Sequence, residues 1–155
     1  MVQLKLAFVK SGTDEPVVLP KTFMTIYDVD QTNHPTKECQ SVQGVSNFIL
    51  SEKTELQVFR TAAERLDPFV KPIDDLVAKA NLPAWREPYV CSTVKGMGAD
   101  NPTDPVNLTP VQRNRAIMIL LEDRSEFYAR LGVPGVGLKT GRNFLFRCAH
   151  AAELL

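Results

Sequence analysis

The sequence predicts an all-β fold, mainly antiparallel, in which two sheets pack as a sandwich resembling a jelly roll. Many short segments alternate apolar and polar residues, as half-buried strands do, and Gly, Pro, Asn and Asp residues separate them. A chain of 155 residues suits one domain, and a chain of this size buries about 68–70% of its unfolded surface. We therefore expect a single domain over residues 1–155 whose core needs neither a metal nor a disulfide.

The first strand is predicted at residues 2–8, where Val2, Leu4 and Leu6 share one face. The same reasoning predicts the other strands at residues 21–28, 38–42, 48–50, 54–59, 88–94, 115–122, 127–131 and 143–148. Residues 116–121 are so continuously apolar that we expect a strand buried on both faces.

Two further segments have helical features. Thr109-Pro110 is typical of the start of a one-turn helix. Residues 61–81 carry apolar side chains at spacings of three and four, but Pro68 and Pro72 prevent one uninterrupted helix. We expect this segment to be a short helical or irregular covering segment over the sheet. The alternative is an arm that docks a neighbouring protein.

Charge and cysteine content narrow the function classes. The 18 basic and 18 acidic residues cancel, which argues against a nucleic-acid partner. No run reaches the roughly 18 apolar residues of a membrane span. The three cysteines, Cys39, Cys91 and Cys148, lack metal-ligand spacing. They allow one disulfide with one free thiol, or three buried thiols.

Oxygen-bearing side chains gather at two predicted turns. Asp28 and Asp30 directly follow the second strand, Glu38 comes soon after, and a second turn lies at residues 98–105. Calcium takes six to eight oxygen ligands in flexible geometry. The candidate calcium ligands are Asp28, Asp30, Glu38, Asp100, Asn101 and Asp104. The same residue types also close turns without any ion, so plain turn chemistry is the alternative.

Catalysis has little support in the sequence. His34 and His150 are the two histidines, and neither adjoins a nucleophile motif. We therefore expect no enzymatic activity.

Two features of the sequence suggest that the protein binds or carries carbohydrate. Trp85 and Tyr89 are the one aromatic pair that could form a platform for a glycan, although a lone tryptophan is more often part of a core. Asn107-Leu108-Thr109 is a glycosylation sequon, which has meaning only in an exported protein.

Four segments together resemble a known family. They are residues 22–30, the dipeptide Glu38-Cys39, residues 100–109 followed by Gln112, and residues 141–146. Their pattern is similar to a lectin-like β-sandwich domain of large, mostly uncharacterised extracellular proteins of microalgae and related protists. The resemblance covers the chain from about Phe8 to Phe146. It implies a surface or secreted module of a larger polypeptide or filament, in which residues 61–81 are an insertion.

These observations favour a non-catalytic structural or adhesive module of a larger extracellular or cell-surface assembly, with other protein subunits as partners and with calcium bracing its loops. One alternative is a carbohydrate-binding module. Another is an accessory subunit of an intracellular complex, in an organelle or the cytoplasm.

Overall fold

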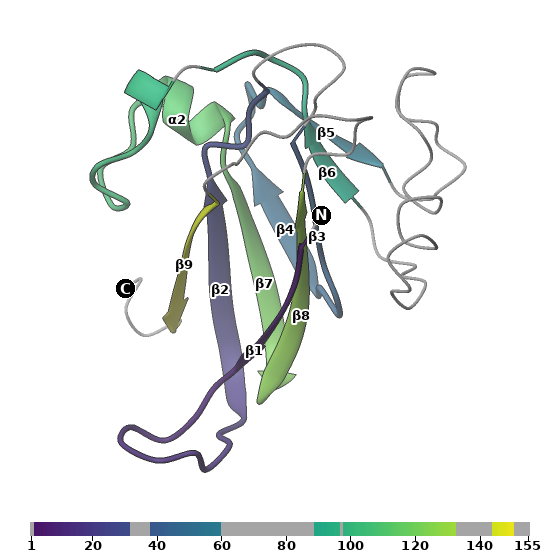
Figure 1. The fold of residues 1–155 in the computed structure, drawn as a ribbon, viewed down its shortest axis with the longest axis vertical. Coiled ribbons are helices and arrows are strands. Elements are labelled where there is room, and N and C mark those ends of the chain that lie inside the picture. The colour runs from purple at the N-terminus through teal and green to yellow at the C-terminus, as the bar shows by residue number, and fades with distance from the viewer. Residues whose placement is uncertain (1, 32–37, 60–88, 97, 133–143, 151–155) are drawn as a thin grey trace.

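The computed structural model describes residues 2–31, 38–59, 89–96, 98–132 and 144–150, which form two antiparallel sheets (Figure 1). The five-stranded sheet has the order β1 (Val2–Ala7), β8 (Glu126–Gly132), β3 (Cys39–Val42), β6 (Tyr89–Ser92) and β5 (Leu56–Phe59). The four-stranded sheet has the order β4 (Asn47–Leu50), β7 (Ile117–Arg124), β2 (Leu19–Tyr27) and β9 (Leu145–His150). The predicted all-β, two-sheet architecture is confirmed.

Strand pairing is nested along the chain. β1 pairs with β8, β2 with β7 and β3 with β6, all antiparallel. The remaining strands extend this arrangement: β4 pairs with β7, β5 with β6, and β9 with β2. Residues far apart in the sequence are therefore neighbours, as Ile26 and Ile117 are in the β2–β7 register.

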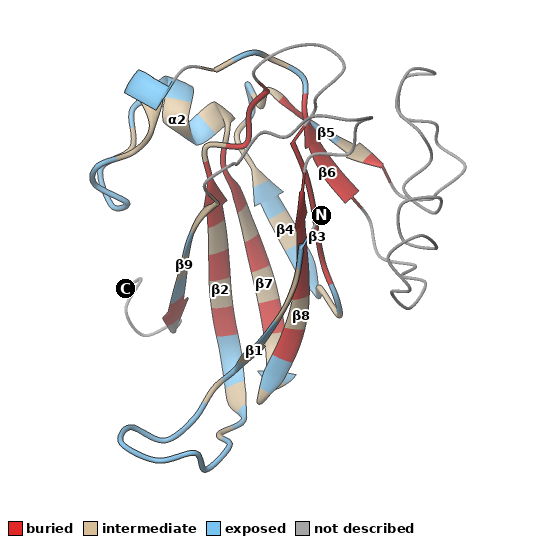
Figure 2. Ribbon diagram, in the orientation of Figure 1, coloured by how far each residue is buried: buried red, intermediate tan, exposed pale blue. Residues whose placement is uncertain are grey.

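The core lies between the two sheets and is built by alternation. On β2 the inward residues Thr22, Met24 and Ile26 are buried, and each lies opposite a buried residue of β7. The alternating bands on β2 and β7 in Figure 2 show this pattern. Burial of apolar side chains is the main favourable term in folding. The alternation therefore fixes which face of each strand meets the other sheet.

The prediction that residues 116–121 are buried on both faces is wrong. On β7, Ile117, Ile119 and Leu121 are buried, whereas Met118 and Leu120 are half-buried. One face of the four-stranded sheet packs against the other sheet, and the opposite face does not become fully buried. An apolar run therefore does not by itself establish burial on both sides.

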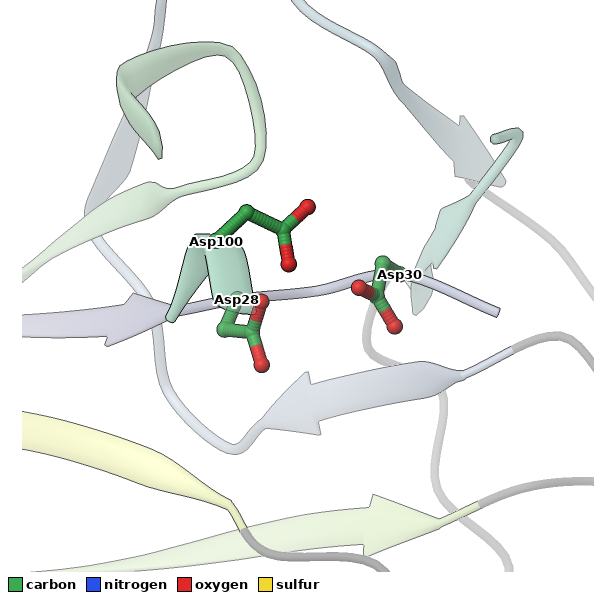
Figure 3. Close-up of side chains that lie close together, drawn as sticks. All are labelled: Asp28, Asp30 and Asp100. Carbon is green, nitrogen blue, oxygen red and sulfur yellow. The ribbon is translucent and has the colours of Figure 1, made fainter. Parts of the chain in front are cut away.

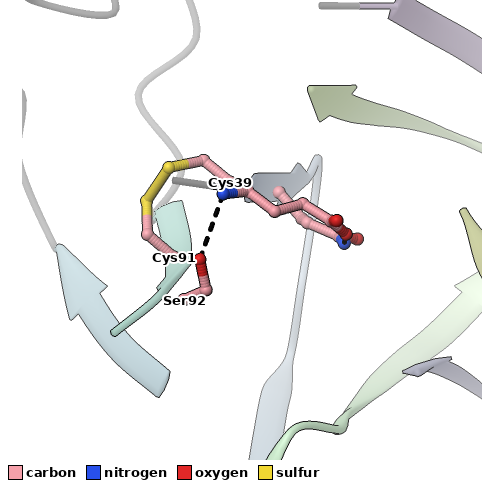
Figure 4. The surroundings of a disulfide bond; sticks show 5 residues. Cys39, Cys91 and Ser92 are labelled. Carbon is pink, nitrogen blue, oxygen red and sulfur yellow. Dashed lines mark hydrogen bonds between the residues drawn. A yellow bond between two sulfur atoms is a disulfide. The ribbon is translucent and has the colours of Figure 1, made fainter. Parts of the chain in front are cut away.

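Burial on both faces occurs instead in β3 and β6, whose residues are all buried. These two strands lie inside the five-stranded sheet. Cys39 and Cys91 lie directly opposite each other there and form a disulfide (Figure 4). Cys148, on the edge strand β9, is a free thiol. The first of the two predicted cysteine arrangements is the one adopted.

Helical structure in the described residues is limited to short pieces. The 3₁₀ turn η1 spans Gly98–Asp100, and the five-residue helix α2 spans Pro110–Asn114. Thr109 caps α2 in a reciprocal capping box with Gln112, which confirms the predicted helix start. No helix in this part of the chain is long and apolar enough to cross a membrane. The predicted covering segment at residues 61–81 lies outside the described residues.

The disulfide should contribute substantially to stability. The bond joins residues 52 positions apart, and closing a loop of that length stabilises by about 4 kcal/mol in the chain-entropy model. We expect the double substitution C39A/C91A to lower the free energy of unfolding in urea by about that amount. The exposed thiol offers a control, because Cys148→Ala should change it by less than about 0.5 kcal/mol. Equal effects of the two changes would contradict the prediction.

Cys148 should react as a sluggish thiol. It is exposed, but neighbouring atoms desolvate it in part, and this desolvation raises its pKa above the usual value. A raised pKa leaves less of the reactive thiolate at pH 8. We expect iodoacetamide to label one thiol of the native protein more slowly than it labels N-acetylcysteine at pH 8, with a rate that climbs as the pH increases. Labelling at the rate of the free thiol would show that the desolvation is absent in solution.

Candidate functional site

Three carboxylates converge at one end of the sandwich (Figure 3). Asp28 and Asp30 directly follow β2, and Asp100 is the last residue of η1. One carboxylate oxygen from each residue lies within 4.8 Å of the others. We call these three residues the acidic cluster. It joins two turns that are about 70 positions apart in the sequence.

The backbone after β2 turns sharply, and this turn positions the two aspartates. Asp28 has a positive φ of 57°, a left-handed conformation that aspartate and asparagine tolerate better than most residues. Val29 is fully buried between them, and its N–H donates to the carbonyl of Arg115 at 2.9 Å. The buried valine therefore anchors the turn.

Asp30 is almost completely buried, at 3% exposure. Its carboxylate lies directly against Gly96, where an added Cβ atom would overlap it. A backbone hydrogen bond holds Gly96 in this position, because its N–H donates to the Gln31 carbonyl at 3.1 Å. Glycine is therefore required at position 96 for the carboxylate to sit where it does.

Arg115 joins the acidic cluster to a third turn. Its Nε lies 2.7 Å from Oε2 of Glu55, and its Nη1 forms ion pairs with Asp30, at 4.0 Å, and with Asp100. The Arg115 side chain is 13% exposed. Burial acts to lower its pKa, but the hydrogen bond and charge of Glu55, together with the charges of Asp100 and Asp30, outweigh it and raise the pKa above its usual value. The guanidinium therefore stays charged.

Within this group of described side chains, carboxylates outnumber the guanidinium. When ionised, the acidic cluster and Glu55 carry four negative charges, and Arg115 supplies one positive charge. These five side chains therefore have a net charge of −3. Like charges this close repel, and a divalent cation would reduce the repulsion.

The other predicted calcium ligands have different surroundings. Asn101 lies beside Asp28, and its amide nitrogen, once the amide is oriented to donate, is 2.8 Å from Oδ2 of that residue. Glu38 is 1% exposed and accepts a hydrogen bond from Nε2 of Gln40 at 2.6 Å, outside the acidic cluster. Of the six predicted ligands, the acidic cluster thus brings together three, and Asn101 adjoins it.

Asp104 closes a turn. Its Oδ1 accepts the N–H of Val106 at 2.8 Å and that of Asn107 at 3.3 Å. The Val106 hydrogen bond, followed by that from the Asn107 side chain, lowers the pKa of Asp104. This is the turn chemistry that the sequence offered as the alternative to an ion.

The predicted carbohydrate features are only partly visible. Tyr89 is 5% exposed on β6, so it does not offer the exposed ring that a glycan platform needs. Trp85 lies outside the described residues, as does His34. Asn107 is exposed, and its Nδ2 donates to Oδ2 of Asp104 at 2.8 Å.

Sequence reasoning missed Arg115, Glu55 and Gly96. None of them forms part of a recognisable motif, because each acts through a contact with a residue distant in sequence. The turn of Asp28 and Asp30 was recognisable because it follows an apolar run. The partners of that turn were not.

Comparisons with known proteins supply no relative for this arrangement. No protein-family model, curated protein or solved structure matches the chain.

Arg115 should stabilise the fold by compensating its carboxylate partners. Removing one member of a buried ion pair typically costs 3–5 kcal/mol, and the partial exposure of Glu55 and Asp100 reduces this. We expect Arg115→Gln to lower the free energy of unfolding by about 1–3 kcal/mol in urea titrations. Lys53→Gln removes the same charge from an exposed position near Glu55 and should change it by less than about 0.5 kcal/mol. An unchanged stability in Arg115→Gln would show that the network contributes nothing.

Proposed function

We propose that this chain is a non-catalytic β-sandwich module of a larger extracellular or cell-surface assembly, with a structural or adhesive role, and that a calcium ion braces it at the acidic cluster. The observation that carries the proposal is the convergence of Asp28, Asp30 and Asp100 from two separate turns. An ion held there would tie the end of β2 to η1.

The strand pairing supports a structural scaffold. In a jelly roll the chain folds as a long rolled hairpin, so that early strands pair with late ones. The nested pairs β1–β8, β2–β7 and β3–β6 follow this scheme and support a fold of the jelly-roll type. β5 departs from it by pairing with β6.

The disulfide supports an extracellular location. Disulfides persist in oxidising compartments and are rare in the cytosol. Cys39 and Cys91 are each 0% exposed, so the bond lies in the interior of the protein, as expected of a structural disulfide. This favours the surface or secreted module over the intracellular subunit.

The chemistry of the acidic cluster supports calcium as the ion. Carboxylates bind calcium through one or both oxygens, and irregular geometry is acceptable to this ion. Three of the carboxylates have oxygens within 4.8 Å of one another, and a divalent cation between them would reduce their mutual repulsion. Arg115 already pairs with two of the three aspartates, so the ion would share them with the guanidinium.

Calcium should raise the melting temperature. Extracellular calcium modules have a Kd of about 0.1–1 mM, so 2 mM calcium should stabilise by about 0.6–1.8 kcal/mol. For a chain of this length the corresponding rise in Tm is about 1–7 °C. Differential scanning fluorimetry in calcium and in EGTA measures it directly.

Two variants give this experiment its controls. Asp28→Asn keeps a residue that tolerates the positive φ but removes one charge, and it should abolish most of the shift. Asp14→Asn changes an exposed aspartate elsewhere and should leave the shift intact. Arg115→Gln should increase the calcium response, because it removes the competing cation. A Tm that is the same in calcium and EGTA would refute the calcium brace.

A further inference from the structure

A small cavity lies between the two sheets. Seven apolar side chains line it, among them Val42, Phe48, Val90 and Ile117, which come from β3, β4, β6 and β7. Its volume, counted as the space open to the centre of a water-sized sphere, is about 20 Å³. If the cavity is round, this corresponds to a width of roughly 6 Å once the radius of water is added.

Gln40 gives the cavity its polar character. Gln40 and Val42 lie two positions apart on β3, so their side chains share a face, and both residues line the cavity together with Ser41 between them. Gln40 lines the cavity and is 2% exposed. Its Nε2 donates to Glu38 at 2.6 Å, whereas its Oε1 has no hydrogen-bond partner among the described residues. A buried acceptor without a hydrogen-bond partner costs free energy, and a bound molecule with a donor would remove this cost.

Water satisfies this requirement poorly. The space is large enough for a water molecule, but buried waters make two to four hydrogen bonds, and seven of the nine lining residues are apolar, the others being Gln40 and Ser41. Of these two, Gln40 supplies the acceptor without a partner among the described residues. A molecule with an apolar body and a single donor matches the lining better. Its body would contact the aliphatic and aromatic side chains while its donor reached Gln40.

We propose that this cavity is a binding site for a small apolar molecule carrying one hydrogen-bond donor, such as a short-chain alcohol, with Gln40 Oε1 as the acceptor. Val45 and Phe48, which line the cavity, are half-buried, so the ligand enters on their side. This site involves none of the residues of the acidic cluster and does not depend on calcium.

NMR titration of methyl-labelled protein tests the proposal with two probes, isopropanol and xenon. Isopropanol has an apolar body and one hydroxyl, whereas xenon has no donor. A ligand of four heavy atoms binds weakly, so the titration should extend through about 1–50 mM. We expect both probes to shift the methyl signals of Val42, Val90 and Ile117 in a saturable manner.

Substitution of Gln40 separates the polar from the apolar contribution. Gln40→Leu keeps a similar volume and removes the acceptor, so isopropanol affinity should fall about fivefold while xenon binding persists. Gln43→Leu, at an exposed glutamine three positions away, should change neither the isopropanol affinity nor the xenon affinity. If Gln40→Leu does not fold, Val90→Ile serves instead, because its extra methyl group fills part of the cavity and should weaken the binding of both probes.

Three outcomes would overturn the proposal. The first is the absence of saturable shifts with isopropanol. The second is an equal loss of affinity for isopropanol and for xenon in Gln40→Leu. The third is a set of water–protein NOEs at Gln40 that persists when isopropanol is added. The last result would identify the cavity as a hydration site.

Discussion

The antiparallel register of β2 and β7 is the constraint on which the core and the candidate site both depend. Inward residues of the two strands face each other in pairs, such as Met24 with Ile119 and Ile26 with Ile117. A slip of one residue would turn every buried side chain of a strand to the opposite face. The same register places the residues after β2 beside those before β7, and Val29 N–H donates to the Arg115 carbonyl there. The aspartates and their arginine therefore meet because the core is in register.

The network around Arg115 extends this constraint to parts of the chain that do not belong to β2 or β7. Glu55 comes from the segment before β5, and Asp100 comes from η1. The Arg115 guanidinium therefore connects loops of both sheets at one end of the sandwich. An arginine suits this position because its planar group donates in several directions and stays charged when partly buried. The carboxylates still outnumber it.

Most of the fold was predictable because strands leave a period-two pattern in the sequence. All nine described strands overlap predicted ones, and the Thr109 cap was recognised from its local chemistry. Burial on both faces was misplaced, because it depends on what covers each sheet rather than on the composition of one strand. The site was half predictable. Asp28 and Asp30 follow a strand, which is visible locally, but Arg115 and Gly96 act through contacts that only the folded register creates.

The two-sided burial of β3 explains why polar chemistry occurs inside the sandwich at all. Glu38, which precedes the strand, is buried, and its amide N–H donates to Oγ of Ser92 at 3.1 Å, beside the disulfide (Figure 4). The Glu38 carboxylate accepts a hydrogen bond from Nε2 of Gln40, which holds the nitrogen of the Gln40 amide in place. That hydrogen bond fixes the amide orientation and leaves the oxygen as the group without a described partner. A buried carboxylate is costly unless it is hydrogen-bonded, and the arrangement that satisfies Glu38 is the one that leaves an acceptor at the cavity.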